Sequence, residues 1–235
     1  MLGNNLIALV VTLALALLWL RLNDYLAHRG IISSHLSRKI IHAGTGPIFV
    51  LCWLLFTDDP SARYLAALVP LGITIQFFLI GIGVLRDQAS VDGMSRTGDP
   101  REILRGPLFY GIVFVILTVI YWHDTPIGIT ALMLLCGGDG LADIFGKRIK
   151  SKSLPWSPTK SWAGSAAMFA GGWIFSIVVL TIFSVTGKVD MTMSGLWIPV
   201  TVITFAATLV ESLPIKDFDN LTVPAVAVVL GHMLF

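Results

Sequence analysis

The sequence predicts an all-α membrane protein, a polytopic helix bundle of about eight transmembrane segments that forms one domain over residues 1–235. Three observations predict this class. Hydrophobic residues make up 55% of the chain and charged residues only 13%, about half of the roughly 25% that is usual in soluble domains. The mean hydropathy is +0.83. The apolar residues also lie in runs close to the 20 or so residues that cross a bilayer as a helix. These values exclude a disordered chain, a fibrous protein and an ordinary cytosolic enzyme.

The candidate spans follow one another along the whole chain and share a mainly apolar composition; they are 4–22, 40–56, 64–85, 106–122, 126–146, 161–186, 195–213 and 222–235. The first run has no basic residues before it and no small-residue cleavage pattern after it, so we expect a span rather than a signal peptide. The fifth run is interrupted by GGDGLAD. The last has 14 residues and is either a short span or a re-entrant segment, which would leave seven spans.

Composition also limits the partners. The net charge is +2 and the basic residues form no single run, so we expect no nucleic-acid binding. Cys52 and Cys136 lie inside apolar runs and outside any CxxC pair. We therefore expect two small core residues and no disulfide.

The basic residues divide unequally between the connections on the two sides of the predicted membrane. One side carries Arg63 and Lys188; the other carries Arg21, Arg29, Arg38, Lys39, Arg86, Arg96, Arg101, Arg105, Lys147, Arg148, Lys150, Lys152, Lys160 and Lys216. Positive residues mark the cytoplasmic side, so we expect both termini to point outward. By the same topology 24 of the 30 charges gather at the inner face. A transporter would carry polar groups at mid-depth, so this asymmetry favours an enzyme at the cytoplasmic lipid–water boundary.

The stretch 136–165 holds the most informative residues. Asp139 and Asp143 are four residues apart, so they share a helix face, where two like charges repel and are costly to bury. Mg²⁺ relieves both problems, because it favours carboxylates together with substrate phosphates. Gly138 and Gly140 are expected to let the backbone open beside the acids. The alternative is that the aspartates pair with arginines of other helices; we favour the metal.

A mixture of glycine, basic and hydroxyl residues follows the two aspartates. Lys160 and Ser161 precede the sixth span, whose N-terminus would offer free N–H groups and a lysine charge to a phosphate. The other candidate nucleotide-binding residues here are Gly146, Lys147, Arg148, Lys152, Gly164 and Ser165. The pattern GxxxxGK[ST] is absent, so this is not a Walker A loop. Residues 147–152 fit an ordinary positive-inside loop equally well.

Three more polar clusters are predicted near the same face. His42, in RKIIHAGTGP, is either a satisfied core histidine or a base or phosphate contact. Arg105, in REILRGPLFYG, either pairs with Glu102 at i, i+3 or binds the nucleotide. Glu211, in TLVESLPIKDFDNLTVP, lies inside the end of a span and needs a partner or a cation. Asn220 follows in the same stretch.

Five blocks in this order, RKIIHAGTG, RGPLFYG, GGDGLADIFGK, KSWAGSAAMF and TLVESLP…DNLTVP, resemble the membrane-bound polyprenol kinase family, most closely its phytol and farnesol kinase branch. The resemblance implies an integral-membrane kinase that moves the γ-phosphate of a nucleotide, typically CTP, to a prenyl alcohol. Carried onto this chain, the family's acidic motif falls on Asp139 and Asp143, its Lys-Ser motif on Lys160 and Ser161, and its Asp-Asn motif on Asp219 and Asn220.

The block WSPTKSWAGS is also similar to the SPxKTxEG pattern of phosphatidate cytidylyltransferases, although Ala163 stands where that family prefers glutamate. Cytidylyl transfer onto phosphatidate is therefore the alternative, with attack at the α-phosphate and pyrophosphate as product. A second alternative is a lipid transporter or scaffold whose charges only set topology and form salt bridges.

In the favoured hypothesis the isoprenoid tail lies among the spans and the hydroxyl at the inner boundary. Asp139 and Asp143, with Glu211, hold Mg²⁺ against the phosphates of CTP, and Lys160 neutralises charge on the transferred group. The base is Asp139, Asp143 or His42; the sequence does not choose between them.

Overall fold

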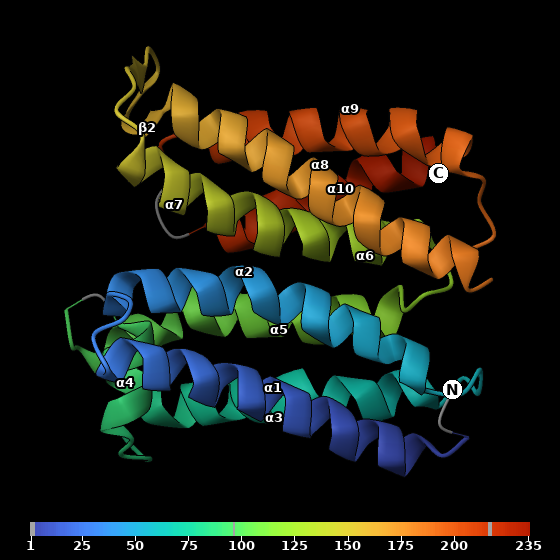
Figure 1. The fold of residues 1–235 in the computed structure, drawn as a ribbon, viewed down its shortest axis with the longest axis horizontal. Helices are drawn as coiled ribbons and strands as arrows, with labels where there is room; N and C mark the ends of the chain where they lie inside the picture. Colours follow the sequence, from blue (N-terminus) through green and yellow to red (C-terminus); the bar gives the residue numbers. More distant parts are fainter. Residues whose placement is uncertain (1–2, 96, 216–217) are drawn as a thin grey trace.

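The computed structural model of the protein is a helix bundle with one small β-hairpin (Figure 1), and it describes residues 3–95, 97–215 and 218–235. Arg96 and Lys216, two of the basic residues used for orientation, lie outside these ranges. The elements, in chain order, are α1 (Asn5–His28), α2 (Ser34–Cys52), the 3₁₀ turn η1 (Trp53–Leu55), α3 (Ala62–Gly81), α4 (Gln88–Met94), the 3₁₀ turn η2 (Pro100–Leu104), α5 (Gly106–Ile120), α6 (Pro126–Met133), the π-helical turn η3 (Leu134–Gly138), α7 (Asp139–Arg148), β1 (Ser153–Leu154), β2 (Ser157–Ser161), α8 (Trp162–Val185), α9 (Met193–Glu211) and α10 (Asp219–Leu234). The predicted all-α class is confirmed.

Each of the eight predicted segments is helical. In the part of the chain that the structure describes, six helical rods are long and apolar enough to cross a membrane: 5–28, 62–81, 100–120, 126–148, 162–185 and 194–211. The other two predicted spans fall on α2, which carries polar and basic residues in its first turns, and on α10, which has 16 residues. The GGDGLAD sequence does not break its rod, because η3 continues α6 directly into α7.

The helices form two groups that meet along α2, α5, α7 and α10. In Figure 1 α1, α2, α3 and α5 lie on one side, and α6, α7, α8, α9 and α10 on the other. Helix α2 packs against η3 and α7, while α5 packs against α10. The buried core joins the two groups through Phe114 of α5, Leu135 of η3 and Met168 of α8. Cys52 and Cys136 are buried and free, as the sequence predicts.

The glycines beside the aspartates have a different role from the predicted one. A Cβ on Gly140 would lie 2.7 Å from the Cβ of Ala43 on α2, and a Cβ on Gly138 would lie 2.6 Å from the Sδ of Met168. Gly140 lies in the regular α-helix α7, whereas Gly138 ends the π-helical turn η3, which is wider than an α-helical turn. The expectation of an opened backbone is therefore wrong for Gly140. Both glycines allow neighbouring helices to approach closely, as small residues do in membrane bundles.

The connections alternate between the two ends of the bundle. Both termini lie at one end of Figure 1, whereas the α1–α2, α3–α5, α7–α8 and α9–α10 connections lie at the other, together with the hairpin. These four connections are the ones that the sequence places on the basic side. The polar residues at the starts of α2, α5, α8 and α10 are thereby brought to one end of the molecule.

Candidate active site

A cavity of about 370 Å³ lies between α1, α2, α3 and α5 and reaches α7 and α10. One part of its wall is polar, with Arg38, Lys39, His42, Thr97, Glu102, Arg105, Asp139, Asp219 and Asn220. The rest is mainly apolar, with Ala16, Leu20, Ile41, Thr45, Pro70, Ile73, Phe77, Met94, Gly106, Pro107, Tyr110, Gly111 and Phe114. Such a wall suits a molecule with a charged or hydroxyl end and a hydrocarbon body.

Next to the polar wall, charged and histidine side chains of α2 face two aspartates of α7. We call this set, His35, Lys39 and His42 opposite Asp139 and Asp143, the charge ladder. Lys39 extends from α2 with its Nζ 3.8 Å from Oδ2 of Asp139 and 3.8 Å from Oδ2 of Asp143. His42 Nε2 lies 3.1 Å from Oδ2 of Asp139, and His35 Nε2 lies 3.1 Å from Oδ2 of Asp143. The spacings 35–39–42 and 139–143 each place residues on one helix face, and here the two faces meet. The aspartates thus pair with lysine and histidine of α2.

Lys147 adds a further ion pair to the charge ladder, beside Asp143 and His35. Its Nζ lies 2.8 Å from Oδ1 of Asp143 and 2.8 Å from Nε2 of His35. Burial lowers the pKa of His35, and the neighbouring Lys147 charge lowers it further despite the nearby carboxylate of Asp143. His35 is therefore neutral at pH 7, and its Nε2 accepts the hydrogen bond that the Lys147 ammonium donates.

His42 is held from three sides. Its Nε2 lies 3.0 Å from the carbonyl oxygen of Leu135 as well as 3.1 Å from Asp139. Because both neighbours are acceptors, Nε2 carries the hydrogen, and in the neutral ring Nδ1 is the free acceptor. Tyr110 donates a 2.8 Å hydrogen bond to the backbone oxygen of His42, and the two ring centroids are 4.4 Å apart. This setting resembles an oriented proton acceptor more than an idle core histidine.

Lys160 forms an ion pair with Glu211, whose side chain is only 4% exposed. Its Nζ also lies 4.0 Å from Oδ2 of Asp219, on the polar wall of the cavity. Burial alone would lower the pKa of Lys160, but the carboxylate of Glu211 outweighs burial and raises it. The lysine is therefore charged at neutral pH, and the partner that the sequence requires for Glu211 is Lys160.

The N-terminus of α8 does not offer the free N–H groups that the sequence suggests. The N–H of Trp162 donates to the carbonyl oxygen of Lys152, at 3.2 Å. The N–H of Ala163 donates to Oγ of Ser151, and that of Gly164 to Oγ of Ser161, at 3.1 and 3.2 Å. Ser151 and Lys152, directly before the β1–β2 hairpin, and Ser161, at its end, thus satisfy the helix start, so the expectation of an open phosphate site there is corrected.

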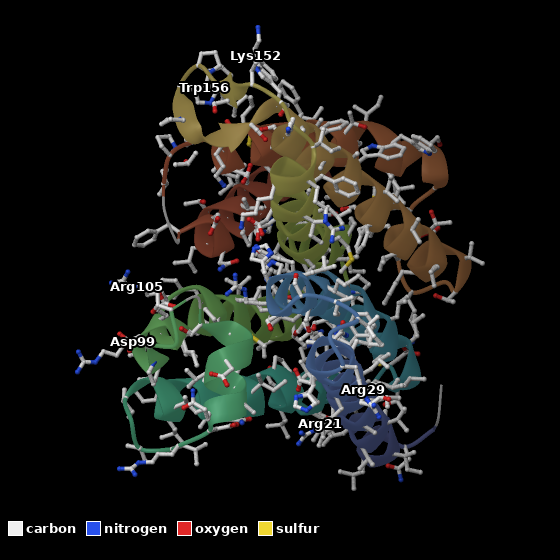
Figure 2. The ribbon with its side chains drawn as sticks, turned by 60° about the vertical axis from the view of Figure 1, so that its left-hand side comes forward. Arg21, Arg29, Asp99, Arg105, Lys152 and Trp156 are labelled. Atoms are coloured by element: carbon white, nitrogen blue, oxygen red, sulfur yellow. The ribbon has the colours of Figure 1, made fainter. Side chains whose placement is uncertain are left out.

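The other candidates in this stretch lie away from the cavity. Gly146 and Gly164 let α7 and α8 touch, since a Cβ on Gly146 would lie 3.2 Å from Cα of Gly164. Ser165 has a buried Oγ with no hydrogen-bond partner among the described residues. Lys152 lies directly before β1, and Figure 2 shows it pointing outward, well separated from Arg105 on the other helix group. Lys147 and Arg148 lie at the exposed end of α7.

The oxygen atoms of the polar wall are suitable ligands for Mg²⁺. Asp139, Asp219 and Asn220 line the cavity together, and Oδ1 of Asn220 is buried with no hydrogen-bond donor among the described residues. Within those residues no three His, Cys, Asp or Glu side chains converge as a preformed metal cage. Mg²⁺ commonly takes one or two carboxylates and completes its shell with water and phosphates. The residues fit a cation that arrives with a nucleotide.

Of the predicted site residues, Asp139, His42, Arg105 and Asn220 thus meet at the cavity. Asp143, Lys160 and Glu211 lie behind them in ion pairs. Three residues are missed by the sequence reasoning: Lys39, His35 and Tyr110. His35 and Lys39 could have been found from their i, i+4, i+7 spacing with His42, which places all three residues on one helix face.

Comparison with known proteins finds relatives that match most of this chain. A probable phytol kinase 2, chloroplastic, of Oryza sativa subsp. japonica is 41% identical over 236 residues, which cover 100% of this chain and 77% of the relative. Phytol kinase 1, chloroplastic, of Arabidopsis thaliana is 37% identical over 90% of this chain and 70% of its own length. Farnesol kinase, chloroplastic, of the same plant is 38% identical over 88% and 68%. No protein-family model and no solved structure matches the chain.

Proposed function

Since the chain belongs to the polyprenol kinase family, in its phytol and farnesol kinase branch, we propose that it transfers the γ-phosphoryl group of CTP to the hydroxyl of a membrane isoprenoid alcohol. The reaction takes place at the cytoplasmic face of the membrane. The substrate class is that of the named relatives, whose members are called phytol and farnesol kinases.

The observation that carries this proposal is the two-part wall of the cavity. Its apolar part, with Ile73, Phe77 and Phe114, suits a branched hydrocarbon chain. Its polar part includes His42 and Asp139, so we place the hydroxyl of the bound alcohol against these two residues. The charged residues of the cavity wall lie in or next to α2, η2, α7 and α10, which approach one another at the end of the bundle that holds the four basic connections. The positive-inside rule then places this end in the cytosol, where the nucleotide is.

The proposed chemistry is a direct transfer. The alcohol oxygen attacks the γ-phosphorus, the bond from that phosphorus to the bridging oxygen breaks, and CDP leaves. His42 takes the hydroxyl proton at Nδ1, while Asp139 accepts a hydrogen bond from Nε2–H and stabilises the charged ring. Catalysis of this kind depends mainly on position and on charge stabilisation.

The remaining residues hold the nucleotide. Arg38 and Arg105 are on the polar wall, and Lys160 stands behind Asp219. Together they neutralise the charge that develops on the transferred group. When bound, Mg²⁺ would be held by Asp139 with Asp143, and by Asp219 or Asn220, and would neutralise the phosphates.

The hairpin region is proposed as a wider nucleotide contact. Lys147, Arg148 and Lys152 are exposed at the cytoplasmic end and attract the anion by long-range charge. Ser161 and Gly164 act indirectly, by fixing the start of α8 so that Lys160 is held beside the cavity. Glu211 has the same role for Lys160, and this ion pair occupies the carboxylate that the sequence suggests as a metal ligand.

The test is a phosphoryl-transfer assay on purified protein in lipid nanodiscs. γ-Labelled CTP or ATP is supplied with Mg²⁺ and one of phytol, farnesol, geranylgeraniol, dolichol or diacylglycerol. We expect label in an isoprenoid monophosphate, with CTP preferred. A parallel reaction with α-labelled CTP and phosphatidate tests the cytidylyltransferase alternative, which label in the lipid with release of pyrophosphate would establish. Absence of label from every lipid would refute the kinase.

Two matched variants connect the activity to the cavity. Asp139→Asn removes a carboxylate at the polar wall, and we expect kcat to fall about 10²–10³-fold, as for other groups that stabilise a transition state. Asp124→Asn makes the same change at the opposite end of the bundle, where Asp124 pairs with Arg63, and should leave kcat within about twofold of the unchanged protein. Equal losses in both variants would contradict the placement of the site.

A further inference from the structure

Lys39 is the residue at the cavity whose position the mechanism above does not explain. Its Nζ is equally far, at 3.8 Å, from Oδ2 of Asp139 and Oδ2 of Asp143. At this distance the ammonium is attracted to both carboxylates but donates a hydrogen bond to neither. A firm structural pair would close to about 2.8 Å on one of them, as Lys147 does on the other oxygen of Asp143.

The carboxylate oxygen that faces Lys39 is incompletely satisfied. Oδ2 of Asp143 is buried, and no residue that the structure describes donates a hydrogen bond to it. His35 Nε2 is 3.1 Å away, but this nitrogen is already hydrogen-bonded to the Lys147 ammonium. A buried carboxylate oxygen without a donor is a good ligand for a small cation.

Lys39 differs from Lys147 in where it can go. Both lysines touch Asp143, but Lys147 is 59% exposed at the end of α7, while Lys39 is 17% exposed and lines the cavity. Its side chain has four rotatable bonds, so the ammonium can leave the carboxylates and remain inside the cavity. Arg38 and Arg105 line the same polar wall, so an ammonium that moves there joins the cations that face the nucleotide phosphates.

We propose that Lys39 and a divalent cation compete for the Asp139–Asp143 pair, and that Lys39, once displaced, contacts the phosphoryl group being transferred. A metal ion bound between these carboxylates repels an ammonium 3.8 Å from each of them, because both carry positive charge. The displaced ammonium then donates hydrogen bonds to the equatorial oxygens of the phosphoryl group. Lys39 thereby makes metal binding and charge stabilisation one coupled event. This inference rests on the proposed kinase function.

The first experiment measures metal binding without turnover. Mn²⁺ replaces Mg²⁺ as a paramagnetic probe, and its binding to purified protein in detergent is followed by the loss of the free-ion electron paramagnetic resonance signal. We expect Lys39→Met to bind Mn²⁺ about tenfold more tightly than the unchanged protein, because the competing ammonium is gone. Lys39→Met combined with Asp143→Asn should lose that gain. Unchanged affinity in Lys39→Met overturns the proposal.

Two further variants serve as controls. Lys188→Met makes the same change at the other end of the bundle, where Lys188 pairs with Asp58, and its Mn²⁺ affinity should stay within about twofold of the unchanged protein. Lys39→Arg keeps the charge, so its Mn²⁺ affinity should resemble that of the unchanged protein even if the methionine variant folds poorly. Tighter Mn²⁺ binding by Lys39→Arg would contradict the competition.

Turnover tests the second half of the proposal. In Lys39→Met, kcat should fall about 10²–10³-fold while KM for the alcohol changes by less than about threefold, because the lost contact forms on the phosphoryl group. Tighter Mn²⁺ binding with an unchanged kcat would show that Lys39 yields the site but does not contact the phosphoryl group. If the unchanged protein phosphorylates no alcohol, the proposed function fails, and the Mn²⁺ comparison still decides the competition.

Discussion

Replacing Lys160 with methionine should destabilise the protein, because it leaves the buried carboxylate of Glu211 without a partner. Glu211 is 4% exposed, whereas the Lys160 side chain is 25% exposed and also lies 4.0 Å from Asp219. Breaking a buried ion pair costs about 3–5 kcal/mol. The partial exposure of Lys160 weakens the pair through solvent screening. We therefore expect the free energy of unfolding to fall by about 2–4 kcal/mol.

The pH range of this loss follows from the raised pKa of Lys160. A lysine whose pKa is raised in the folded state contributes fully below its unfolded pKa of about 10.4, and the contribution is lost only as the pH rises through the folded value. The difference between Lys160→Met and the unchanged protein should therefore persist up to about pH 9. It should shrink as the pH falls, because the lone buried carboxylate of Glu211 can then take up a proton. A loss that is larger at about pH 6 than at about pH 9 would contradict the assignment.

Cys52 and Cys136 provide the assay, since both are buried free thiols that react with a fluorogenic maleimide only on unfolding. Thermal midpoints are compared for Lys160→Met, Glu211→Gln and the double variant. The double variant buries no lone charge and should recover at least half of the loss. If it is no more stable than Lys160→Met, the pairing argument is refuted. If it recovers stability without activity, Lys160 acts on the substrate as well as on Glu211.

Two other predictions use the same assay. Gly140→Val should lower the free energy of unfolding by about 1–3 kcal/mol, because α2 and α7 must separate to accept the added side chain. Gly72→Ala is the control: nothing lies within 4 Å of the added carbon, so this change should not destabilise α3. Equal effects of the two changes would contradict the packing argument. Burial and the charge of Lys188 lower the pKa of His123, so the unfolded chain binds more protons below about pH 6.5 and stability should fall there. His123→Gln should reduce that fall between pH 7.5 and 5.5, and an undiminished fall would refute the assignment.

The helical rods could be predicted from the sequence because hydropathy and length are local properties. Segments such as 64–85 and 161–186 agree with α3 and α8 to within a few residues. The short elements could not be predicted in this way. Helix α4 has seven residues and β1 has two. The end of α4 is held by a contact distant in sequence, the 3.1 Å hydrogen bond from Arg38 to the Ser95 carbonyl oxygen, and β1 is held by its pairing with β2.

The site could be predicted only in part. Periodicity shows which residues share one face of a helix, but it does not show which other helix packs against that face. The four-residue spacing of Asp139 and Asp143 correctly predicts that they share a helix face, but nothing in this spacing identifies α2 as the partner helix. For this reason the sequence alone indicates Lys39 only as one of the basic residues that set the membrane orientation. The start of α8 could not be predicted for a related reason. The acceptors for its first two N–H groups come from Ser151 and Lys152, directly before a hairpin that the sequence pattern does not indicate.

The close packing and the chemistry of the site have one cause. An aspartate side chain is short, so Asp139 reaches His42 and Lys39 only if the backbones of α2 and α7 are close. Gly140, directly after Asp139, meets Ala43, directly after His42, and these two small residues set that distance. A larger residue at either position would lengthen the distances from Asp139 to His42 and from Asp139 to Lys39 together. The Gly140→Val variant should therefore lose more activity than its stability loss explains, since transfer depends on geometry more steeply than folding does. Activity measured below the unfolding midpoint separates the two effects, and full activity in the folded fraction would refute this link.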